Sequence, residues 1–324
     1  MTTPAKLKIF KNFLYLAWKH LQLPEPTEIQ YQMADYLQYG PKRLCIQAFR
    51  GAGKSWITSA FACWNWLMDP QKNILVISAS KTRADDFSTF TQRLINEIPI
   101  LAHLQPNDDQ RSSKVSFDVG PARASHAPSC KSMGITGQLT GSRADLIIAD
   151  DVESANNSQT QLMRDRLSET VKEFDSIIKP EIGRIVFLGT PQTELSIYNE
   201  LEERGYKTQI WPARFPDSKA IVSYGHKLAK QILEQNKKYK PGQPLDPKRF
   251  DEVDLMEREA SYGRSGFSLQ FMLDTTLSDT NKYPLKLNDL IIMSGCSTWK
   301  EAPGKVQWAN SIDQIKALDS ELPN

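Results

Sequence analysis

The feature that most constrains the fold is the segment of residues 44–55, LCIQAFRGAGKS. An apolar, β-forming run leads into two glycines and then into Lys54 and Ser55, which predicts a buried strand, a tight loop and a helix start. Gly51 and Gly53 allow the backbone to direct its N–H groups at phosphate oxygens. Lys54 can then reach the β- and γ-phosphates, and the Ser55 hydroxyl can ligate Mg²⁺. The segment therefore predicts a nucleoside triphosphate site.

This segment departs at one position from the general pattern G-x-x-x-x-G-K-[ST], because Ala48 stands where the first glycine belongs. The residues that follow are apolar and predict a helix over 54–68, which Asp69 and Pro70 end. The positive end of that helix dipole would point at the bound phosphates. The alternative interpretation is a glycine-rich turn before an ordinary core helix, with Lys54 solvated.

The composition is typical of a globular protein and limits the classes of function. Of 324 residues, 40% are hydrophobic and 24% are charged, and the net charge of +2 does not by itself indicate nucleic-acid binding. We find no stretch suited to a membrane span or an export signal, and 9–21 is predicted as a packed amphipathic helix. The cysteines form no C-x-x-C pair, which favours reduced thiols in the cytoplasm over disulfides or zinc; they are Cys45, Cys63, Cys130 and Cys296.

Apolar runs bounded by turn residues alternate with helical patterns, which predicts an α/β fold with a mostly parallel sheet. Strands are predicted at 44–48, 74–79, 115–119, 132–136, 146–150, 185–188 and 208–211. Further helices are predicted at 27–37, 82–97, 159–178 and 194–204. The helix 82–97 is expected to begin with the pair Thr82 and Asp85 and to end before Pro99. Because the composition changes after Pro212, we expect a phosphate-loop core at 1–212, a lid or linker at 213–277 and a tail at 278–324.

Residues 145–153, DLIIADDVE, predict an apolar strand that ends in acids. An acid at the tip of such a strand can hold the Mg²⁺ that bridges the β- and γ-phosphates, and Asp150 suits this role. A second acid can orient and deprotonate the attacking water, and Asp151 and Glu153 are both candidates for this catalytic base. The alternative is an ordinary acidic surface turn, which the phosphate loop upstream disfavours.

Other polar residues are candidates for the same site. Thr190 and Gln192 follow the predicted strand 185–188 and could sense the γ-phosphate, or they could form a plain turn between a strand and a helix. Gln30 lies upstream of the loop strand, where a glutamine can read the adenine edge, but a solvated glutamine on a helix fits the pattern as well.

Two arginines occupy positions that matter for phosphate chemistry. Arg50 lies inside the loop, which is an unusual place for a charge unless it faces a phosphate or an acid. Arg143 precedes the acidic strand and is expected at the end of that strand opposite to the acids. It could therefore reach the nucleotide of a neighbouring subunit as an arginine finger. Solvation at the surface or a structural ion pair is the alternative.

Several motifs together resemble one protein family. They are QAFRGAGKS (47–55), GITGQLTGSRAD (134–145), IIADDVE (147–153), FLGTPQ (187–192), WPA (211–213), PLDPKRF (244–250) and GFSLQFML (266–273). This combination resembles the large terminase subunit of short-tailed phages, also called DNA maturase B, over nearly the whole chain. The resemblance implies an additional-strand, RecA-like P-loop fold, with an ATPase core at 1–212 that uses ATP and Mg²⁺.

The resemblance also implies roles for individual residues by matching position. It implies adenine contact and phosphate binding by Gln30, Arg50, Gly51, Ala52, Gly53, Lys54 and Ser55. It implies metal binding by Ser55 and Asp150, and catalysis by Lys54 and by Arg143 acting between subunits. The segment that couples hydrolysis to movement is matched by Gly189, Thr190 and Pro191. The family usually has Glu directly after the metal-binding Asp, whereas this chain has Asp151, so the choice of base between Asp151 and Glu153 stays open.

The implied function is a motor that translocates double-stranded viral DNA into a procapsid during genome packaging. The implied partners are double-stranded DNA, the portal protein, the small terminase subunit and further copies of the chain in a homopentameric ring. We expect the host cytoplasm as the location, with transient docking on the procapsid and no membrane partner.

The family's large subunit normally continues into an RNase H-like nuclease, and this chain stops about where that domain would begin, so we expect no DNA cleavage from it. A superfamily 2-like helicase and an ATP-dependent assembly scaffold without turnover are the alternative functions. Candidate DNA contacts near strand ends are Lys81, Arg83 and Lys131.

Overall fold

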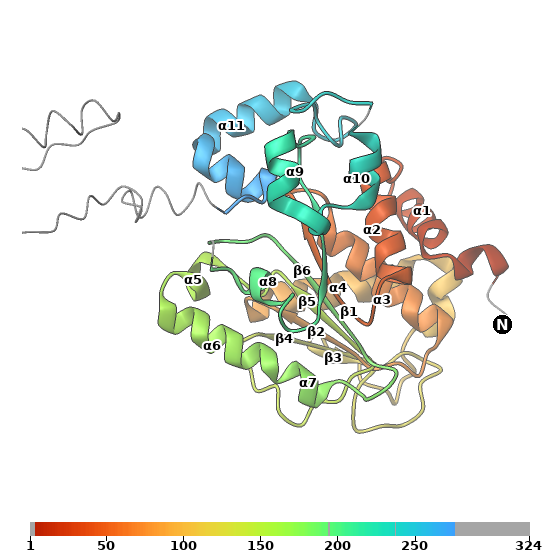
Figure 1. Cartoon of the computed structure of the whole chain (residues 1–324). Coiled ribbons are helices and arrows are strands. Elements are labelled where there is room, and N and C mark those ends of the chain that lie inside the picture. Colours follow the sequence, from red (N-terminus) through yellow and green to blue (C-terminus); the bar gives the residue numbers. More distant parts are fainter. Residues whose placement is uncertain (1–3, 194, 237, 276–324) are drawn as a thin grey trace, which may run out of the picture. The chain divides into compact units, whose positions relative to one another are not determined.

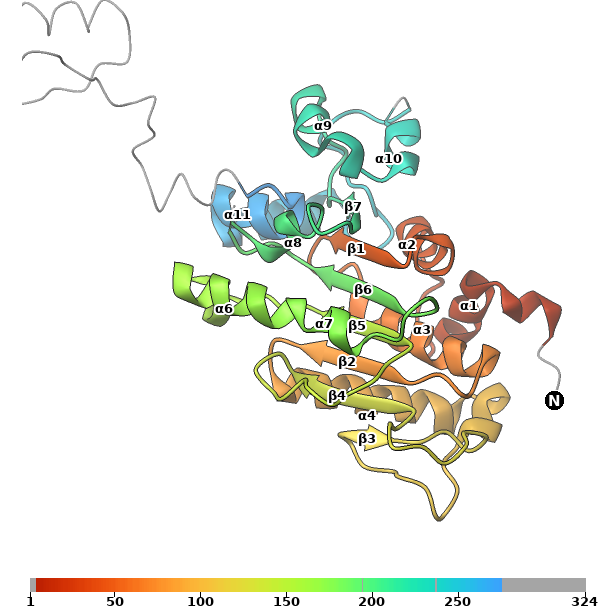
Figure 2. The same ribbon diagram turned by 60° about the horizontal axis from the view of Figure 1, so that its bottom comes forward.

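The strands of the described residues form one seven-stranded sheet (Figure 2). The computed structural model describes residues 4–193, 195–236 and 238–275. The strand order is β3-β4-β2-β5-β6-β1-β7, and every neighbouring pair is parallel except β3 with β4. The strands are β1 (Arg43–Ala48), β2 (Ile74–Ser78), β3 (Ser116–Phe117), β4 (Cys130–Gly134), β5 (Leu146–Asp150), β6 (Arg184–Gly189) and β7 (Lys207–Trp211). Each predicted strand is therefore present.

The position of β6 decides the class of the fold. Leu188 in β6 lies opposite Ile46 in β1 on one side and opposite Asp150 in β5 on the other side. The strand that leads into the phosphate loop and the strand that ends in acids are thus separated by one inserted strand. This order is the additional-strand arrangement of a RecA-like P-loop protein, so the predicted fold class is confirmed.

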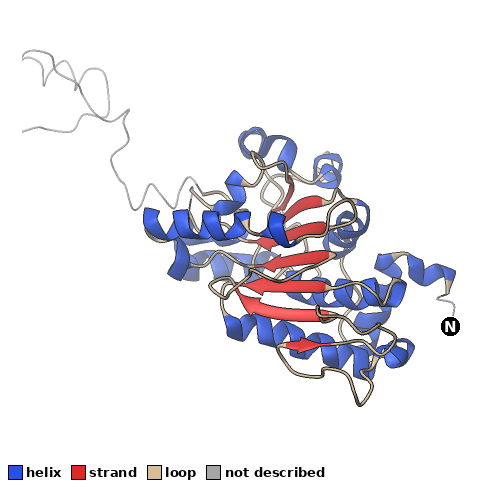
Figure 3. Ribbon diagram, turned by 90° about the horizontal axis from the view of Figure 1, so that it is seen from below, coloured by secondary structure: helices blue, strands red, loops and turns tan. Residues whose placement is uncertain are grey.

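Helices flank the sheet (Figure 3), and successive residues of the central strands pack into two hydrophobic cores, one on each face. In β5, for example, Ile148 belongs to one core and Ile147 to the other. The first core is covered by α1 (Phe10–His20), α2 (Glu28–Tyr39), α3 (Lys54–Met68) and α4 (Lys81–Glu97), and the second by α6 (Gln161–Lys172), α7 (Phe174–Ile177) and α8 (Ile197–Glu200). Burial on both faces explains why these strands are continuous apolar runs.

The helix α4 begins one residue earlier than predicted and has a different cap. Ser80 is the N-cap residue, and its hydroxyl accepts a hydrogen bond from the Arg83 N–H at 3.3 Å. Asp85 does not help to cap the helix, because it forms a salt bridge with Lys81 at 2.6 Å. The prediction that Thr82 and Asp85 start this helix is therefore wrong. The predicted end is correct, because the next element, the 3₁₀ helix η2, spans Pro99–Leu104.

The predicted helix 159–178 is divided in the structure. α5 (Ala155–Ser158) precedes α6, and α6 is separated from α7 at Glu173, whose N–H bonds to the Thr170 carbonyl in a tight turn. Within the predicted helix 194–204, the described residues form only the short helix α8. β4 spans Cys130–Gly134 rather than 132–136, because its pairing with β2 starts at Cys130. These differences are set by contacts between elements, which a local pattern does not contain.

After β7 the chain leaves the sheet and forms the lid segment, which we define as the described residues from 213 to 275 (Figure 1). Its helices are α9 (Ser218–Tyr224), η3 (Gly225–Lys227), α10 (Lys230–Gln235), α11 (Glu252–Phe267) and the π-helix η4 (Ser268–Met272). The Ala213 N–H donates to the Phe271 carbonyl at 2.8 Å, and the Leu245 N–H donates to the Ala213 carbonyl at 2.8 Å. Leu245 and Phe271 of the lid segment therefore both lie beside Ala213, the first residue of that segment after β7.

The predicted domain division at residue 212 stays a prediction, and the predicted tail 278–324 lies outside the described residues. At the other end of the chain, the 3₁₀ helix η1 (Ala5–Lys8) precedes α1, which confirms the packed helix predicted at 9–21. No helix in the described part of the chain has the length and apolar character that crossing a bilayer requires.

Candidate active site

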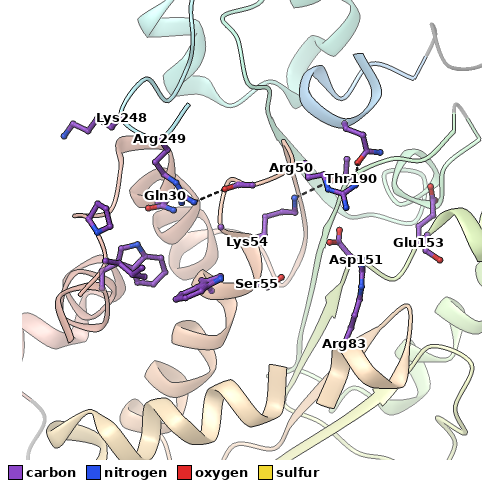
Figure 4. Close-up of a pocket in the computed structure, with 18 of the residues that line it drawn as sticks. Gln30, Arg50, Lys54, Ser55, Arg83, Asp151, Glu153, Thr190, Lys248 and Arg249 are labelled. Atoms are coloured by element: carbon purple, nitrogen blue, oxygen red, sulfur yellow. Dashed lines mark hydrogen bonds between the residues drawn. The ribbon is translucent and has the colours of Figure 1, made fainter. Parts of the chain in front are cut away.

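A cavity of about 850 Å³ lies at the carboxyl ends of β1, β5 and β6 (Figure 4). It brings together most of the residues predicted for the site, namely Gln30, Arg50, Gly51, Gly53, Lys54, Ser55, Asp151, Glu153, Thr190 and Gln192. The other lining residues had no predicted role in nucleotide binding; they are Trp18, Leu23, Pro24, Glu25, Trp56, Arg83, Ser154, Ala155, Lys248, Arg249 and Gln270. Asp150 lines an adjoining cavity of about 350 Å³, together with Ser55, Arg83 and Asp151.

The phosphate loop has the backbone shape that its glycines predict. Gly51 and Gly53 have φ angles of +93° and +91°, which lie in the left-handed region that favours glycine. Gly53 is also the N-cap residue of α3, so the loop passes directly into the helix. A side chain at Gly51 would meet a second obstacle, because its Cβ would lie 2.6 Å from Cζ of Phe250. Both conformation and space therefore favour glycine at this position.

Lys54 is buried and its ammonium is folded back against the loop. Its Nζ donates hydrogen bonds to the Ala48 carbonyl at 2.8 Å and to the Thr190 hydroxyl at 3.2 Å. Thr190 follows β6, the strand beside β1. Lys54, which is predicted to bind phosphate, thus directly contacts Thr190 of the predicted coupling segment.

Asp150 and Ser55 form the pair that the sequence predicts for a metal ion. The Ser55 hydroxyl donates to Asp150 Oδ2 at 2.7 Å. Burial raises the pKa of the Asp150 carboxyl to about 7, and the neighbouring charge of Asp151 adds to the shift, while the Ser55 hydrogen bond and Lys54 oppose it. Oδ1 of Asp150 is buried and has no hydrogen-bond partner among the described residues. A hydroxyl and a carboxylate with an unpartnered oxygen are hard donors, so this pair fits Mg²⁺.

The two candidates for the catalytic base lie in different surroundings. Asp151 has a φ of +45°, a left-handed conformation that is unusual for a residue other than glycine, and it lines both cavities. Arg83 extends from α4 toward it (Figure 4). Strained backbone of this kind is common at functional sites, where surrounding structure holds a side chain in position.

Glu153 is buried, and both of its carboxylate oxygens accept hydrogen bonds. Oε1 accepts from the Gln192 N–H at 2.8 Å, and Oε2 accepts from the Ser196 hydroxyl at 2.7 Å and the Ile197 N–H at 2.8 Å. Burial raises the pKa of Glu153, and these hydrogen bonds act in the opposite direction. Glu153 lies in the loop after β5, and its carboxylate therefore links this loop to the residues that follow β6.

The side chain of Gln30 forms hydrogen bonds both with the start of α2 and with the phosphate loop. Its Oε1 accepts the Thr27 N–H at 3.2 Å, which forms part of a capping box at the start of α2. Its Nε2 donates to the Ala52 carbonyl at 3.0 Å. Adenine reading by Gln30 stays a prediction.

The lid segment also contacts the loop, which the sequence reasoning missed. Arg50 donates its N–H to the Gln270 carbonyl at 2.9 Å, and Arg249 donates to the Gly51 carbonyl at 3.0 Å. Both lid residues lie in motifs that carry the family resemblance, PLDPKRF and GFSLQFML. Only the family resemblance of these motifs could have indicated a role for Arg249 and Gln270, because nothing in the local sequence around them points to a phosphate site.

Arg143 lies at the opposite end of β5 from the acids, as expected, and is exposed. Its Nη1 donates to the Ser142 carbonyl at 2.9 Å. Arg143 is not among the residues that line the two cavities described here. A role for it between subunits stays a prediction.

Comparison with known proteins shows what the chain as a whole is similar to. Residues 45–176 match the family model described as terminase large subunit, T4likevirus-type, N-terminal. Over 322 residues the chain is 50% identical to the terminase large subunit of Enterobacteria phage T3. Over this length the chain is similar to a terminase large subunit. The alignment covers 97% of the chain and 54% of the T3 protein, so the chain spans about half the length of this terminase.

Two solved terminase structures have similar chain traces. The large terminase ATPase domain of Thermus phage P74-26 is 13% identical, with a TM-score of 0.43, and the match covers 80% of this chain and 97% of that one. The large terminase of bacteriophage HK97 is 12% identical, with a TM-score of 0.47, and the match covers 82% of this chain and 55% of that one. Because both TM-scores are below 0.5, the fold is assigned from the strand order of the sheet and not from these two structures.

Proposed function

We propose that this terminase relative binds ATP with Mg²⁺, hydrolyses it, and uses the energy to move double-stranded viral DNA into a procapsid. The observation that carries the proposal is the convergence of a phosphate loop, the Ser55–Asp150 pair and Asp151 at the carboxyl ends of β1 and β5, the two strands that flank β6. The 50% identity to the T3 terminase large subunit supports the packaging role.

The loop binds the triphosphate through backbone N–H groups, and the N-terminus of α3 adds a favourable dipole. Lys54 is the cation for the β- and γ-phosphates, and binding would replace its contacts with Ala48 and Thr190. Arg50 lines the same cavity and adds a second cation from within the loop. Gln30 is proposed to contact the adenine in addition to holding the loop at Ala52.

Ser55 and Asp150 are proposed to hold Mg²⁺, which when bound would offset the charge of the β- and γ-phosphates. Asp151 is proposed as the base, because it lines the cavity beside this pair. Glu153 is the less suitable candidate, because three donors already occupy its oxygens.

In the proposed step, the carboxylate of Asp151 takes a proton from a water molecule as the water oxygen forms a bond to the γ-phosphorus. The bond between that phosphorus and the oxygen of the β-phosphate breaks, and the products are ADP and inorganic phosphate. Lys54 stabilises the charge on the leaving group. Arg143 of a neighbouring copy is proposed to add positive charge at the transition state.

Coupling to movement is proposed to begin at Thr190, because its hydroxyl contacts Lys54. A change in this contact would move Thr190, and this movement would be passed on to its neighbours Gly189 and Pro191 and to the following residues, which Glu153 binds. The proposed partners are double-stranded DNA, the portal protein, the small terminase subunit and four further copies in a ring. This assembly would form in the host cytoplasm and dock on the procapsid.

The first experiment is ATP turnover per subunit as the protein concentration rises, with and without double-stranded DNA. A steep rise is expected, because Arg143 would complete the site of a neighbour, and Arg143→Ala should remove that rise. A flat rate would overturn the role of Arg143. A rate that DNA does not increase would favour an assembly scaffold over a motor. Lys54→Ala should abolish turnover, and unchanged turnover in this variant would contradict the site itself.

A further inference from the structure

A loop that turns its N–H groups inward toward phosphate turns carbonyl groups outward, and these carbonyls need donors of their own. In this loop the carbonyls of Gly51 and Ala52 accept hydrogen bonds from side chains outside the loop. The guanidinium of Arg249 donates to both, through Nη2 to Gly51 at 3.0 Å and through Nη1 to Ala52 at 3.4 Å. Gln30 donates to the same Ala52 carbonyl at 3.0 Å. The outer side of the phosphate loop is therefore held by side chains.

Arg249 is held in place by the residues next to it. The carboxylate of Asp246 accepts a hydrogen bond from the Thr27 hydroxyl at 2.9 Å, in a buried position at the start of α2. The Arg249 N–H in turn bonds to the Asp246 carbonyl at 3.1 Å. The ring of Phe250 packs edge to face on Phe49 with ring centroids 5.2 Å apart. These contacts fix the backbone on both sides of Arg249.

A second lid contact holds the opposite side of the loop. The carbonyl of Gln270 accepts the Arg50 N–H at 2.9 Å, and its side-chain Oε1 accepts from Arg50 Nη1 at 3.3 Å. Two separate parts of the lid segment therefore contact four successive positions of the loop, from residue 49 to residue 52.

We propose that Arg249 is a positioning residue that holds the phosphate loop in its binding shape by bridging the carbonyls of Gly51 and Ala52. This inference rests on the proposed function of the loop as the ATP phosphate site. A planar guanidinium can donate two divergent bonds to neighbouring carbonyls, whereas an ammonium at the end of a lysine cannot reproduce that fork. Arg249 therefore acts through its shape and not only through its charge.

The test compares Arg249→Lys with Arg264→Lys. Arg264 is the matched control, because it carries the same substitution in the lid segment, lies on α11, is exposed and lines neither cavity. The first measurement is the Kd for Mg-ADP by titration calorimetry. We expect Arg249→Lys to raise this Kd about tenfold, which corresponds to about 1.4 kcal/mol, and Arg264→Lys to change it less than about twofold. At saturating ATP, kcat of Arg249→Lys should stay within about twofold of wild type, because the residue does not touch the reacting atoms.

The second measurement is amide hydrogen exchange of the loop peptide around residues 49–53 without nucleotide. Arg249→Lys should exchange faster there than wild type, and Arg264→Lys should not. An unchanged Kd in Arg249→Lys would overturn the proposal, as would a raised Kd with unchanged loop exchange, since that pair of results indicates direct contact with the nucleotide. Failure of the wild-type chain to bind Mg-ADP would instead contradict the proposed function.

Discussion

The inner end of the cavity, around Lys54 and Asp150, and its outer end, around Arg249 and Gln270, are built from the chain in different ways. The inner end uses residues that adjoin three neighbouring strands, so the sheet itself brings them together. The outer end joins residues 198 and 220 positions apart, and no shared strand positions them. Under the proposed function, the inner end carries the chemistry, and the outer end shapes the loop on which that chemistry depends.

Apart from Lys54→Ala, the largest effect is expected for Asp151→Asn at the inner end. Removal of a base typically lowers a rate by about 10²–10⁴-fold, so turnover should fall by that amount while the Kd for ATP stays within a few-fold. Glu153→Gln is the matched variant, and its turnover should fall less than about tenfold. Steady-state ATPase assays with both variants decide this, and a larger loss in Glu153→Gln would reverse the assignment of the base.

Gly51→Ala tests how closely the outer end contacts the loop. An L-residue at φ +93° carries strain of about 1–2 kcal/mol, and the contact with Phe250 should add about 1–3 kcal/mol. Gly141→Ala is the control, because Gly141 has φ +86° with nothing within 4 Å, so it shows the conformational cost alone. The free energy of unfolding in urea should fall more for Gly51→Ala. Equal losses would mean that Phe250 moves aside without cost.

Glu153→Gln should also lower stability, because an amide cannot accept all the bonds that the carboxylate accepts. The expected loss in the free energy of unfolding is about 1–3 kcal/mol, since at least one buried donor would lose its partner. The loss should be smaller when Ser196 is already replaced by Ala, because the two residues share a bond. Full additivity in this double-mutant cycle would show that the Ser196 contact contributes nothing.

The smallest effect is expected for Asp246→Asn at the outer end. Burial raises the pKa of Asp246, and its hydrogen bond from Thr27 opposes the shift. A folded-state pKa above the unfolded value favours folding while the group is protonated, and this contribution is lost as the pH rises through the folded pKa. The variant, which mimics the protonated form, should therefore gain stability relative to wild type from pH 4 to pH 7, by under about 1 kcal/mol. Urea unfolding at both pH values tests the sign, and a relative loss would contradict it.

The sequence was sufficient to predict the sheet and the inner end of the site, because both depend on local patterns. The apolar runs predict the strands, and the glycines before Lys54 predict the positive φ angles found there. Parallel strands then place Asp150 and Thr190 near Lys54 without further information.

The outer end and two helices could not be predicted, because they depend on partners far away in the chain. Arg249 has no local pattern that points to the Gly51 carbonyl. The helix predicted at 194–204 is reduced to α8, where Glu153 accepts the Ile197 N–H at the start of the helix. The helix 159–178 is likewise interrupted where Phe174 enters the second core.

The contact between Arg50 and Gln270 has a consequence for the order of events during synthesis. The two residues are 220 positions apart, so at about 5–20 residues per second the ribosome adds Gln270 about 10–40 s after Arg50. During that interval the nascent chain carries its phosphate loop without the donors and acceptors of the lid segment. The ability to bind nucleotide tightly should therefore arise late in translation, after the chain that supplies those contacts has left the exit tunnel.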